Sequence, residues 1–257
     1  MAPLPLDHLR STRSPALLAL LRLTQPRAGR EGSPGESCIT VASCFSCSAF
    51  VQQVMDSVSA FWEDEHELRI PMVHIWGCES DQEVHAFDLD TIVNQRPGTG
   101  DRYYRDASQF RNGKCLNVVT QTWEKPPSPD ILHCGFLFSK PQKTTSGSAA
   151  QDPRAWSSVY GIVCCVRPVM VHLQHLGEYA SLEDVKDSDI SAVLSDLHGL
   201  GYVTSYWLAP AHELGSPIKR TRFLVVGILA QDEKASALNR IAMVLESIVG
   251  AGWPPNC

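Results

Sequence analysis

The sequence predicts an α/β fold, in which helices cover both faces of a mostly parallel central sheet. Three observations predict it. Short apolar runs bounded by turn residues alternate with amphipathic segments of helical length along the chain. The 257 residues are 44% hydrophobic, which suffices to bury the core of one domain. The apolar run 131–138 leads into a polar loop, and such loops bind ligands in open α/β sheets.

The first half of the chain alternates as this fold requires. Strands are predicted at 38–43, 72–79, 115–121 and 131–138, because these runs are apolar and flanked by turn residues. Helices are predicted at 50–62 and 81–94, where apolar residues recur at helical spacing. The segment 95–113 is polar and contains Gly and Pro, so it is predicted to be a long loop.

The second half continues the pattern. Asp152-Pro153 starts a predicted helix, and Ser181 with Asp184 three residues later starts another that ends near Gly199. Strands are predicted at 169–176, 202–210 and 221–229, and an amphipathic helix at 231–250. Residues 37–250 are therefore predicted to form one domain, with a disordered or targeting extension at 1–36 and a tail at 251–257. The extension is arginine-rich, so it is either unstructured or an organellar transit peptide.

Composition limits the function. The formal charge of −6 and the pI near 5.8 mean that any nucleic-acid contact requires a local basic patch. The nine cysteines lie mostly within apolar runs, as expected of reduced thiols packed as small hydrophobic groups. No apolar run has the length of a membrane span, so no membrane association is predicted. Glu79 ends the second strand, where a carboxylate can accept both hydroxyls of a ribose; the alternative is a solvated strand end.

The central strand resembles a motif of the cytosine-5 DNA methyltransferases. That motif has Asp-Ile-Leu, two small residues and Gly-Phe, followed by Pro-Cys; here residues 130–132, Gly135 and Phe136 match it. Phe138 takes the place of the catalytic cysteine. The family's first motif, Phe-x-Gly-x-Gly, is matched by Phe45-Ser46-Cys47-Ser48-Ala49, which keeps the aromatic residue and replaces both glycines.

Further motifs follow in the same order. Glu79 matches the acidic end of the second motif, and Asn117 falls where the family has an aspartate that contacts the adenine amino group. Gln174 stands where the family has the glutamate that protonates the target base. Arg220 and Arg222 match an Arg-x-Arg before a strand, and are predicted either to contact phosphate or to pair with a carboxylate such as Glu213.

The resemblance implies a Rossmann-like S-adenosylmethionine-dependent methyltransferase fold and a nuclear location, or a mitochondrial or plastid one if the extension is a transit peptide. It implies cofactor binding by Phe45, Ser46, Cys47, Glu79 and Gly135, together with Asn117, and no metal. Because Phe138 cannot attack a base and Gln174 cannot donate an acidic proton, the chain is predicted to be catalytically degenerate. The alternatives are a methyltransferase with another mechanism or substrate, and a non-catalytic module that binds a homologous methyltransferase.

Two cysteine patterns leave alternatives open. Cys134 lies on the central strand and is either a displaced nucleophile or a core residue, and the core is favoured. Cys44-x-x-Cys47 lacks a second ligand pair at metal spacing, so a structural role is favoured over zinc or redox chemistry. His172 and His175 flank Gln174 and are expected to be structural.

Overall fold

The computed structural model describes residues 38–46, 48–66, 71–90, 102–137, 155–175, 187–210 and 219–230. The predicted extension 1–36, the last predicted helix and the tail 251–257 lie outside these ranges, so the predicted division of the chain stays a prediction. None of the described helices is both long and apolar enough to cross a bilayer.

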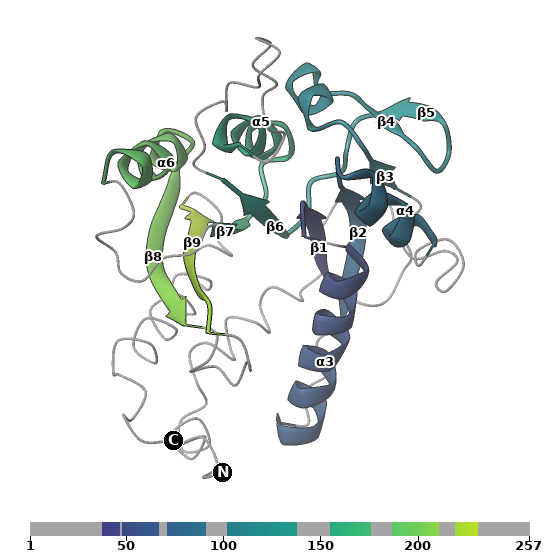
Figure 1. The fold of residues 1–257 in the computed structure, drawn as a ribbon. Helices are drawn as coiled ribbons and strands as arrows, with labels where there is room; N and C mark the ends of the chain where they lie inside the picture. The colour runs from purple at the N-terminus through teal and green to yellow at the C-terminus, as the bar shows by residue number, and fades with distance from the viewer. Residues whose placement is uncertain are drawn as a thin grey trace.

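The described elements form one nine-stranded sheet flanked by helices (Figure 1). Its strands are β1 (Ile39–Cys44), β2 (Met72–Cys78), β3 (Tyr103–Tyr104), β4 (Cys115–Asn117), β5 (Thr122–Glu124), β6 (Ile131–Phe136), β7 (Met170–His175), β8 (Tyr202–Pro210) and β9 (Thr221–Leu229). Its helices are α3 (Ser48–His66), α4 (Gln82–Asp90), the 3₁₀ helix η2 (Ala107–Asn112), α5 (Trp156–Val166) and α6 (Asp187–Gly199).

The strand order is β5-β4-β3-β2-β1-β6-β7-β9-β8. The five central strands, from β3 to β7, are parallel, whereas β9 runs antiparallel between β7 and β8. From β1 the chain first builds the sheet outward through β2 and β3, then returns to the other side of β1 with β6. This reversal is the topological switch point of a doubly wound sheet. The predicted Rossmann-like α/β fold, with a mostly parallel central sheet, is confirmed by this arrangement.

The two faces of the sheet bury separate apolar clusters. Ala42 and Leu132 face α5 and α6, whose buried side chains include Val159 and Val193. Val41, on the alternate side of β1, packs in the second cluster with residues of α3. In Figure 1, α5 and α6 lie together above the sheet, and α3 extends below β1 and β2. Each fully buried aliphatic side chain contributes about 1.5–3 kcal/mol, so α5, which is buried along most of its length, anchors the upper layer.

The third parallel strand differs from the prediction. It is β3, which lies inside the segment predicted to be a loop, whereas the predicted strand 115–121 is only the short β4, paired antiparallel with β3 and β5. The strand was not predicted because the sequence around Tyr103 and Tyr104 is polar. Both tyrosines are fully buried because their hydroxyls have partners: Tyr103 donates to Asp88 of α4 at 2.6 Å, and Tyr104 donates to Glu124 at 3.0 Å.

At the amino ends of β1 and β6, Asp130 and Thr40 form a buried clip. The Asp130 carboxylate accepts from the Thr40 backbone N–H at 2.9 Å and from its hydroxyl at 2.7 Å. The Asp130 backbone N–H in turn lies 2.9 Å from Thr40 Oγ1. Asp130 is the first residue of the Asp-Ile-Leu motif, so in this fold that residue joins two strands at the edge opposite to their carboxyl ends.

Candidate functional site

The carboxyl ends of the parallel strands bring most of the predicted site residues to one edge of the sheet. Phe45 follows β1, Glu79 follows β2, Gly135 lies near the end of β6 and Gln174 near the end of β7. Because β9 is antiparallel, its first residues, including Arg222, reach the same edge. Phe138 and Cys47 lie outside the described residues. Ligands bind at this edge in open α/β sheets, beside the switch point.

Glu79 is a buried carboxylate, and the alternative of a solvated strand end is wrong. Its residue is 5% exposed, its backbone N–H donates to the Tyr104 carbonyl at 3.1 Å, and its Oε1 accepts from the Asp81 backbone N–H at 2.9 Å. Burial raises the pKa of the Glu79 carboxyl, against the backbone donors of Asp81 and Ser80, which favour the charged form. Asp81 caps α4 by accepting from two backbone N–H groups, which fixes the loop that holds Glu79.

A hollow of about 430 Å³ opens beside Ser80, the residue after Glu79, where β2 and β3 end. It is lined by Ser80, Arg105, Asp106, Ala107, Gln109, Leu116, Val118 and Gln121. Asp106 follows β3 and caps η2, because its Oδ1 accepts from the Ser108 backbone N–H at 2.8 Å. The hollow therefore lies between two acidic strand ends, and its volume lies within the range of small-molecule sites.

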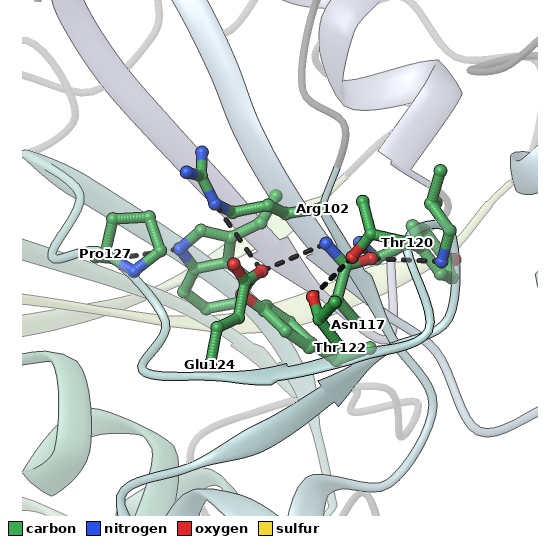
Figure 2. Close-up of polar contacts among 10 residues, drawn as sticks. Arg102, Asn117, Thr120, Thr122, Glu124 and Pro127 are labelled. Carbon is green, nitrogen blue, oxygen red and sulfur yellow. Dashed lines mark hydrogen bonds and ion pairs between the residues drawn. The ribbon is translucent and has the colours of Figure 1, made fainter.

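Asn117 is held within a polar network (Figure 2). It is 1% exposed; its Oδ1 accepts from the backbone N–H groups of Tyr103 and Val119, and its Nδ2 donates to Glu124 Oε1 at 3.0 Å. Arg102 Nε lies 3.5 Å from the same Glu124 oxygen. These contacts tie together β3, β4 and β5. The predicted role of Asn117 in contacting adenine stays a prediction.

Asp106 is the residue that sequence reasoning missed. It stands two residues after β3, whereas the prediction gave the adenine contact to Asn117, counted back from Asp130. Two signals in the sequence mark it. Two adjacent aromatic residues precede it, and Ser108 follows two residues later, a pattern typical of an aspartate that caps a helix.

The turn after β1 is tight. Phe45 has φ 57°, in the left-handed region that non-glycine residues rarely adopt, and its backbone N–H donates to the Cys78 carbonyl at 2.9 Å. Its side chain is 6% exposed and packs in the upper core. The Ser46 hydroxyl donates to the Cys44 carbonyl at 3.0 Å. The strained turn positions the loop toward α3, while the cofactor contacts predicted for Phe45 and Ser46 stay predictions.

Gly135 and Gln174 are register neighbours on β6 and β7, and Gln174 is paired with Leu224 of β9. Arg222 precedes Leu224 by two residues, so its side chain leaves the same face of the sheet as that of Gln174. Gln174 and Arg222 are half-buried, and Arg220 is exposed. The structure therefore brings Arg222 and Gln174 to the same face of the sheet, at the carboxyl edge of the parallel strands, and Arg220 lies just before β9 at the same edge.

Three cysteines form a row across the sheet. Cys44 is in register with Cys78 on β2 and with Cys134 on β6, and each is at most 1% exposed. Burial raises the pKa of the Cys44 thiol, and hydrogen bonds with the other two thiols raise it further. Cys134 is therefore a core residue, as favoured from the sequence. No cluster of three metal-binding side chains exists among the described residues.

Of the histidines on the central strands, His175 is buried, and His133 and His172 are half-buried. His133 Nδ1 lies 2.8 Å from His172 Nδ1, and desolvation lowers the pKa of these histidines to about 3 and about 4. His175 packs edge-on against Phe136, and burial followed by the charge of Arg222 lowers its pKa to about 4. A structural role for His172 and His175 agrees with these surroundings.

Comparisons with known proteins find likeness only among solved structures. No family model matches the chain, and no curated protein matches it. Schizosaccharomyces pombe Dnmt2 methyltransferase is 11% identical with a TM-score of 0.42, covering 76% of this chain and 50% of that one. A mutant of Spodoptera frugiperda DNMT2 is 9% identical with a TM-score of 0.46, covering 76% of this chain and 51% of that one. Methanococcus jannaschii fibrillarin, a pre-rRNA processing protein, is 12% identical with a TM-score of 0.43, covering 84% and 75%.

The chain spans about half the length of the two Dnmt2 structures. At these identities, the likeness concerns the fold alone. The fold assignment given above rests on the strand order of the sheet itself.

Proposed function

We propose that this protein binds S-adenosylmethionine at the carboxyl edge of its sheet and is a degenerate relative of the cytosine-5 DNA methyltransferases. The observation that carries the proposal is Glu79, a buried carboxylate at the end of β2 whose chain neighbour Ser80 lines a hollow of about 430 Å³. A carboxylate at that position suits the two hydroxyls of a ribose. When bound, the cofactor would supply a methyl group activated by a sulfonium.

The residues around the hollow fit such a ligand. Glu79 would accept from the ribose, and Asp106, which lines the hollow, would accept from the adenine amino group. Asn117 is the alternative adenine partner, but its amide already bridges three strands. The turn at Phe45 and Ser46 would face the amino-acid end of the cofactor, next to Cys47, and Gly135 would permit close approach at β6.

The catalytic loss is proposed from the residues at the reacting end. Phe138 offers no nucleophile that can add to carbon 6 of a cytosine, and Gln174 has no acidic proton to donate. Cys134 is fully buried and hydrogen-bonded to another thiol, so it does not replace the missing nucleophile. These residues therefore supply neither the nucleophile nor the acid that methyl transfer through a covalent base adduct requires.

Calorimetric titration with S-adenosylhomocysteine tests the binding part of the proposal. We expect measurable binding by the full chain, and loss of that binding in Glu79→Ala. Asp81→Ala is unsuitable as a control because Asp81 holds the Glu79 loop, so the control is Asp90→Ala at the exposed end of α4. Thermal melts of both variants show whether they fold. No binding by the folded wild-type chain would contradict the cofactor proposal.

A separate assay tests the degenerate state. The chain is incubated with tritiated S-adenosylmethionine and with cytosine-containing DNA or RNA, and the recovered nucleic acid is counted. We expect cofactor binding without incorporation of label. Label on cytosine would show an active methyltransferase with another mechanism and would overturn the degenerate assignment while leaving the cofactor site intact.

Nucleic-acid contact by Arg220 and Arg222 is part of the same proposal. Both arginines lie at the edge where the target base would have to approach, and guanidinium groups recognise phosphate. Replacing both with alanine should weaken salt-sensitive retention of DNA. Unchanged retention would assign them a structural role, such as pairing with a carboxylate.

A non-catalytic interaction module is the second candidate. Trp123 favours it, because its side chain is 61% exposed on β5, the edge strand of the sheet. Exposed tryptophans on unpaired strand edges are typical of surfaces that bind other proteins, here by proposal a homologous methyltransferase. Co-purification that is lost in Trp123→Ala would support this function, and unchanged co-purification would remove Trp123 from it.

A further inference from the structure

A second hollow runs along α5, on the other side of η2 from the candidate cofactor site. Its volume is about 640 Å³, and the residues that carry its chemistry are Phe110, Arg111, Lys125, Trp156, Tyr160 and Asp196. Ala107 and Gln109 of η2 line the cofactor hollow, whereas Phe110 and Arg111 line this one. We call this second hollow the α5 groove. It plays no part in the function proposed above.

The α5 groove carries positive charge that the described residues do not neutralise. Arg111 and Lys125 are exposed, and within the described ranges neither has a carboxylate partner. Arg111 donates one hydrogen bond, from Nη2 to the Ser157 carbonyl at 3.1 Å. The single carboxylate of the lining, Asp196, accepts from the indole N–H of Trp156 at 2.8 Å. Two exposed cations that have no ion partner among the described residues suit an anionic ligand.

The same groove holds a pair of aromatic rings that is already positioned. Trp156 and Tyr160 stand one helical turn apart on α5, with ring centroids 5.9 Å apart. Trp156 is fixed by its bond to Asp196 and by an edge contact with Phe136, whose centroid is also 5.9 Å away. Both rings are half-buried, so each keeps part of its surface open. Because the two side chains are already held in place, they lose little conformational entropy when a base stacks on them.

Gly161 sets the position of Arg111 in the α5 groove. A Cβ at Gly161 would lie 3.1 Å from Arg111 Cγ and 3.4 Å from its Nε. The absence of a side chain therefore lets the arginine stem cross α5 and brings its guanidinium to the Ser157 carbonyl. Glycine inside a helix costs about 1 kcal/mol relative to alanine, so its presence here is explained by this close approach.

We propose that the α5 groove binds single-stranded nucleic acid, with bases against Trp156 and Tyr160 and phosphates against Lys125 and Arg111. A nucleic-acid strand supplies an aromatic face and a negative charge at each residue, which matches both halves of the lining. An acidic peptide would satisfy the cations and leave the aromatic pair without a role. The proposal goes beyond the cofactor site and does not depend on cofactor binding or catalysis.

Fluorescence anisotropy with short 5′-labelled oligo-dT and oligo-rU, over a series of salt concentrations, tests the proposal on the full chain. Lys125→Ala should reduce the salt slope of log K by about 1, as expected for one lost phosphate contact. Tyr160→Ala should weaken binding about fivefold or more, as expected for one lost stacking contact. The matched control is Lys114→Ala, because Lys114 is also an exposed lysine but does not line the groove; it should leave affinity and slope unchanged.

Gly161→Ala gives a charge-neutral test, since it displaces Arg111 without removing it. We expect weaker binding in this variant, with a melting temperature that shows the fold is retained. The comparison is repeated in the Arg220→Ala/Arg222→Ala background, so that contacts made by these two arginines do not mask the result. Equal affinity for the Lys125, Tyr160 and Lys114 variants would overturn the proposal, as would equal displacement of the oligonucleotide by poly-glutamate.

Titration with S-adenosylhomocysteine on the same variants separates the two proposals. Retained cofactor binding in Lys125→Ala, with lost oligonucleotide binding, shows two independent sites. If the chain binds the oligonucleotide but not S-adenosylhomocysteine, the proposal for the α5 groove is supported and only the cofactor proposal is contradicted.

Discussion

Replacement of Asp130 by alanine should destabilise the protein strongly without changing its site. In the folded state one carboxylate oxygen accepts from the Thr40 backbone N–H at 2.9 Å and from the Thr40 hydroxyl at 2.7 Å. Asp130 is 3% exposed and Thr40 is 9% exposed, so water does not readily replace the lost acceptor. A buried donor left without a partner costs about 1–3 kcal/mol, so the two donors together should cost about 3–4 kcal/mol.

Urea unfolding followed by circular dichroism measures this cost, and a double-mutant cycle isolates the clip. Thr40→Val removes the hydroxyl but keeps the backbone donor, so the cycle with Asp130→Ala should give a coupling of about 1–2 kcal/mol. Asp130→Asn keeps one side-chain oxygen as acceptor and should lose about half as much as Asp130→Ala. A loss below about 1 kcal/mol in Asp130→Ala, or a coupling near zero, would refute the role of the clip.

The same variants test where the motif acts. Asp130 lies at the amino ends of the strands, at the edge opposite to Glu79 and Gln174. At low temperature, where Asp130→Asn is still folded, S-adenosylhomocysteine should bind it as it binds the wild type. A large loss of affinity in the folded variant would show that the site responds to this end of the sheet.

Three further predictions concern stability. Asn117→Ala should lower the free energy of unfolding by about 2–3 kcal/mol, because Glu124 and two backbone N–H groups lose a buried partner; a change under about 0.5 kcal/mol in urea unfolding would contradict this. Gly113→Ala should cost about 1 kcal/mol through its φ of 70° alone, since nothing lies within 4 Å of the added Cβ, and Gly113→Asn should cost less. His133 and His172 have pKa values of about 3 and about 4 in the folded state, below the unfolded value, so the stability they contribute is complete above about pH 6.5 and is lost as pH falls toward 4. At pH 5 the loss should be on the order of 2 kcal/mol per histidine, measured as a lower urea midpoint than at pH 7; His172→Asn should flatten this dependence, and equal midpoints for the wild type at both pH values would count against it.

The second half of the fold follows closely from the sequence. The predicted strands 202–210 and 221–229 coincide with β8 and β9, because an alternating run and a continuous apolar run, each bounded by turn residues, allow few other structures. Helix α5 was predicted from apolar spacing, and it spans Trp156–Val166 within the predicted 152–168. The start predicted at Asp152 lies outside the described residues.

The region between α4 and β6 could not be predicted from local patterns. Strand β3 has two residues and stands in a polar segment, and its burial comes from partners distant in sequence, Asp88 and Glu124. Because this strand was missed, Asp106, two residues after β3, was not considered as a site residue. Short strands held by tertiary hydrogen bonds carry little periodicity, so they are the elements that pattern analysis misses.

The candidate site was predicted in part. The sequence placed Glu79, Gly135 and Gln174 at strand ends, and the structure brings them to one edge. It did not indicate that Glu79 would be buried, because burial there depends on the loop fixed by Asp81. The α5 groove could not be predicted either, because its lining comes from four separate segments of the chain.

The position of β9 has a consequence for synthesis of the protein. This strand is the last described segment of the chain, yet it enters the sheet between two strands that are made before it. While a ribosome is still adding the residues after 218, β7 and β8 each lack β9, their antiparallel partner among the described strands. Nascent chains at that stage expose two strand edges able to pair with other chains, so we expect aggregation during translation to be sensitive to the speed at which residues 219–230 emerge.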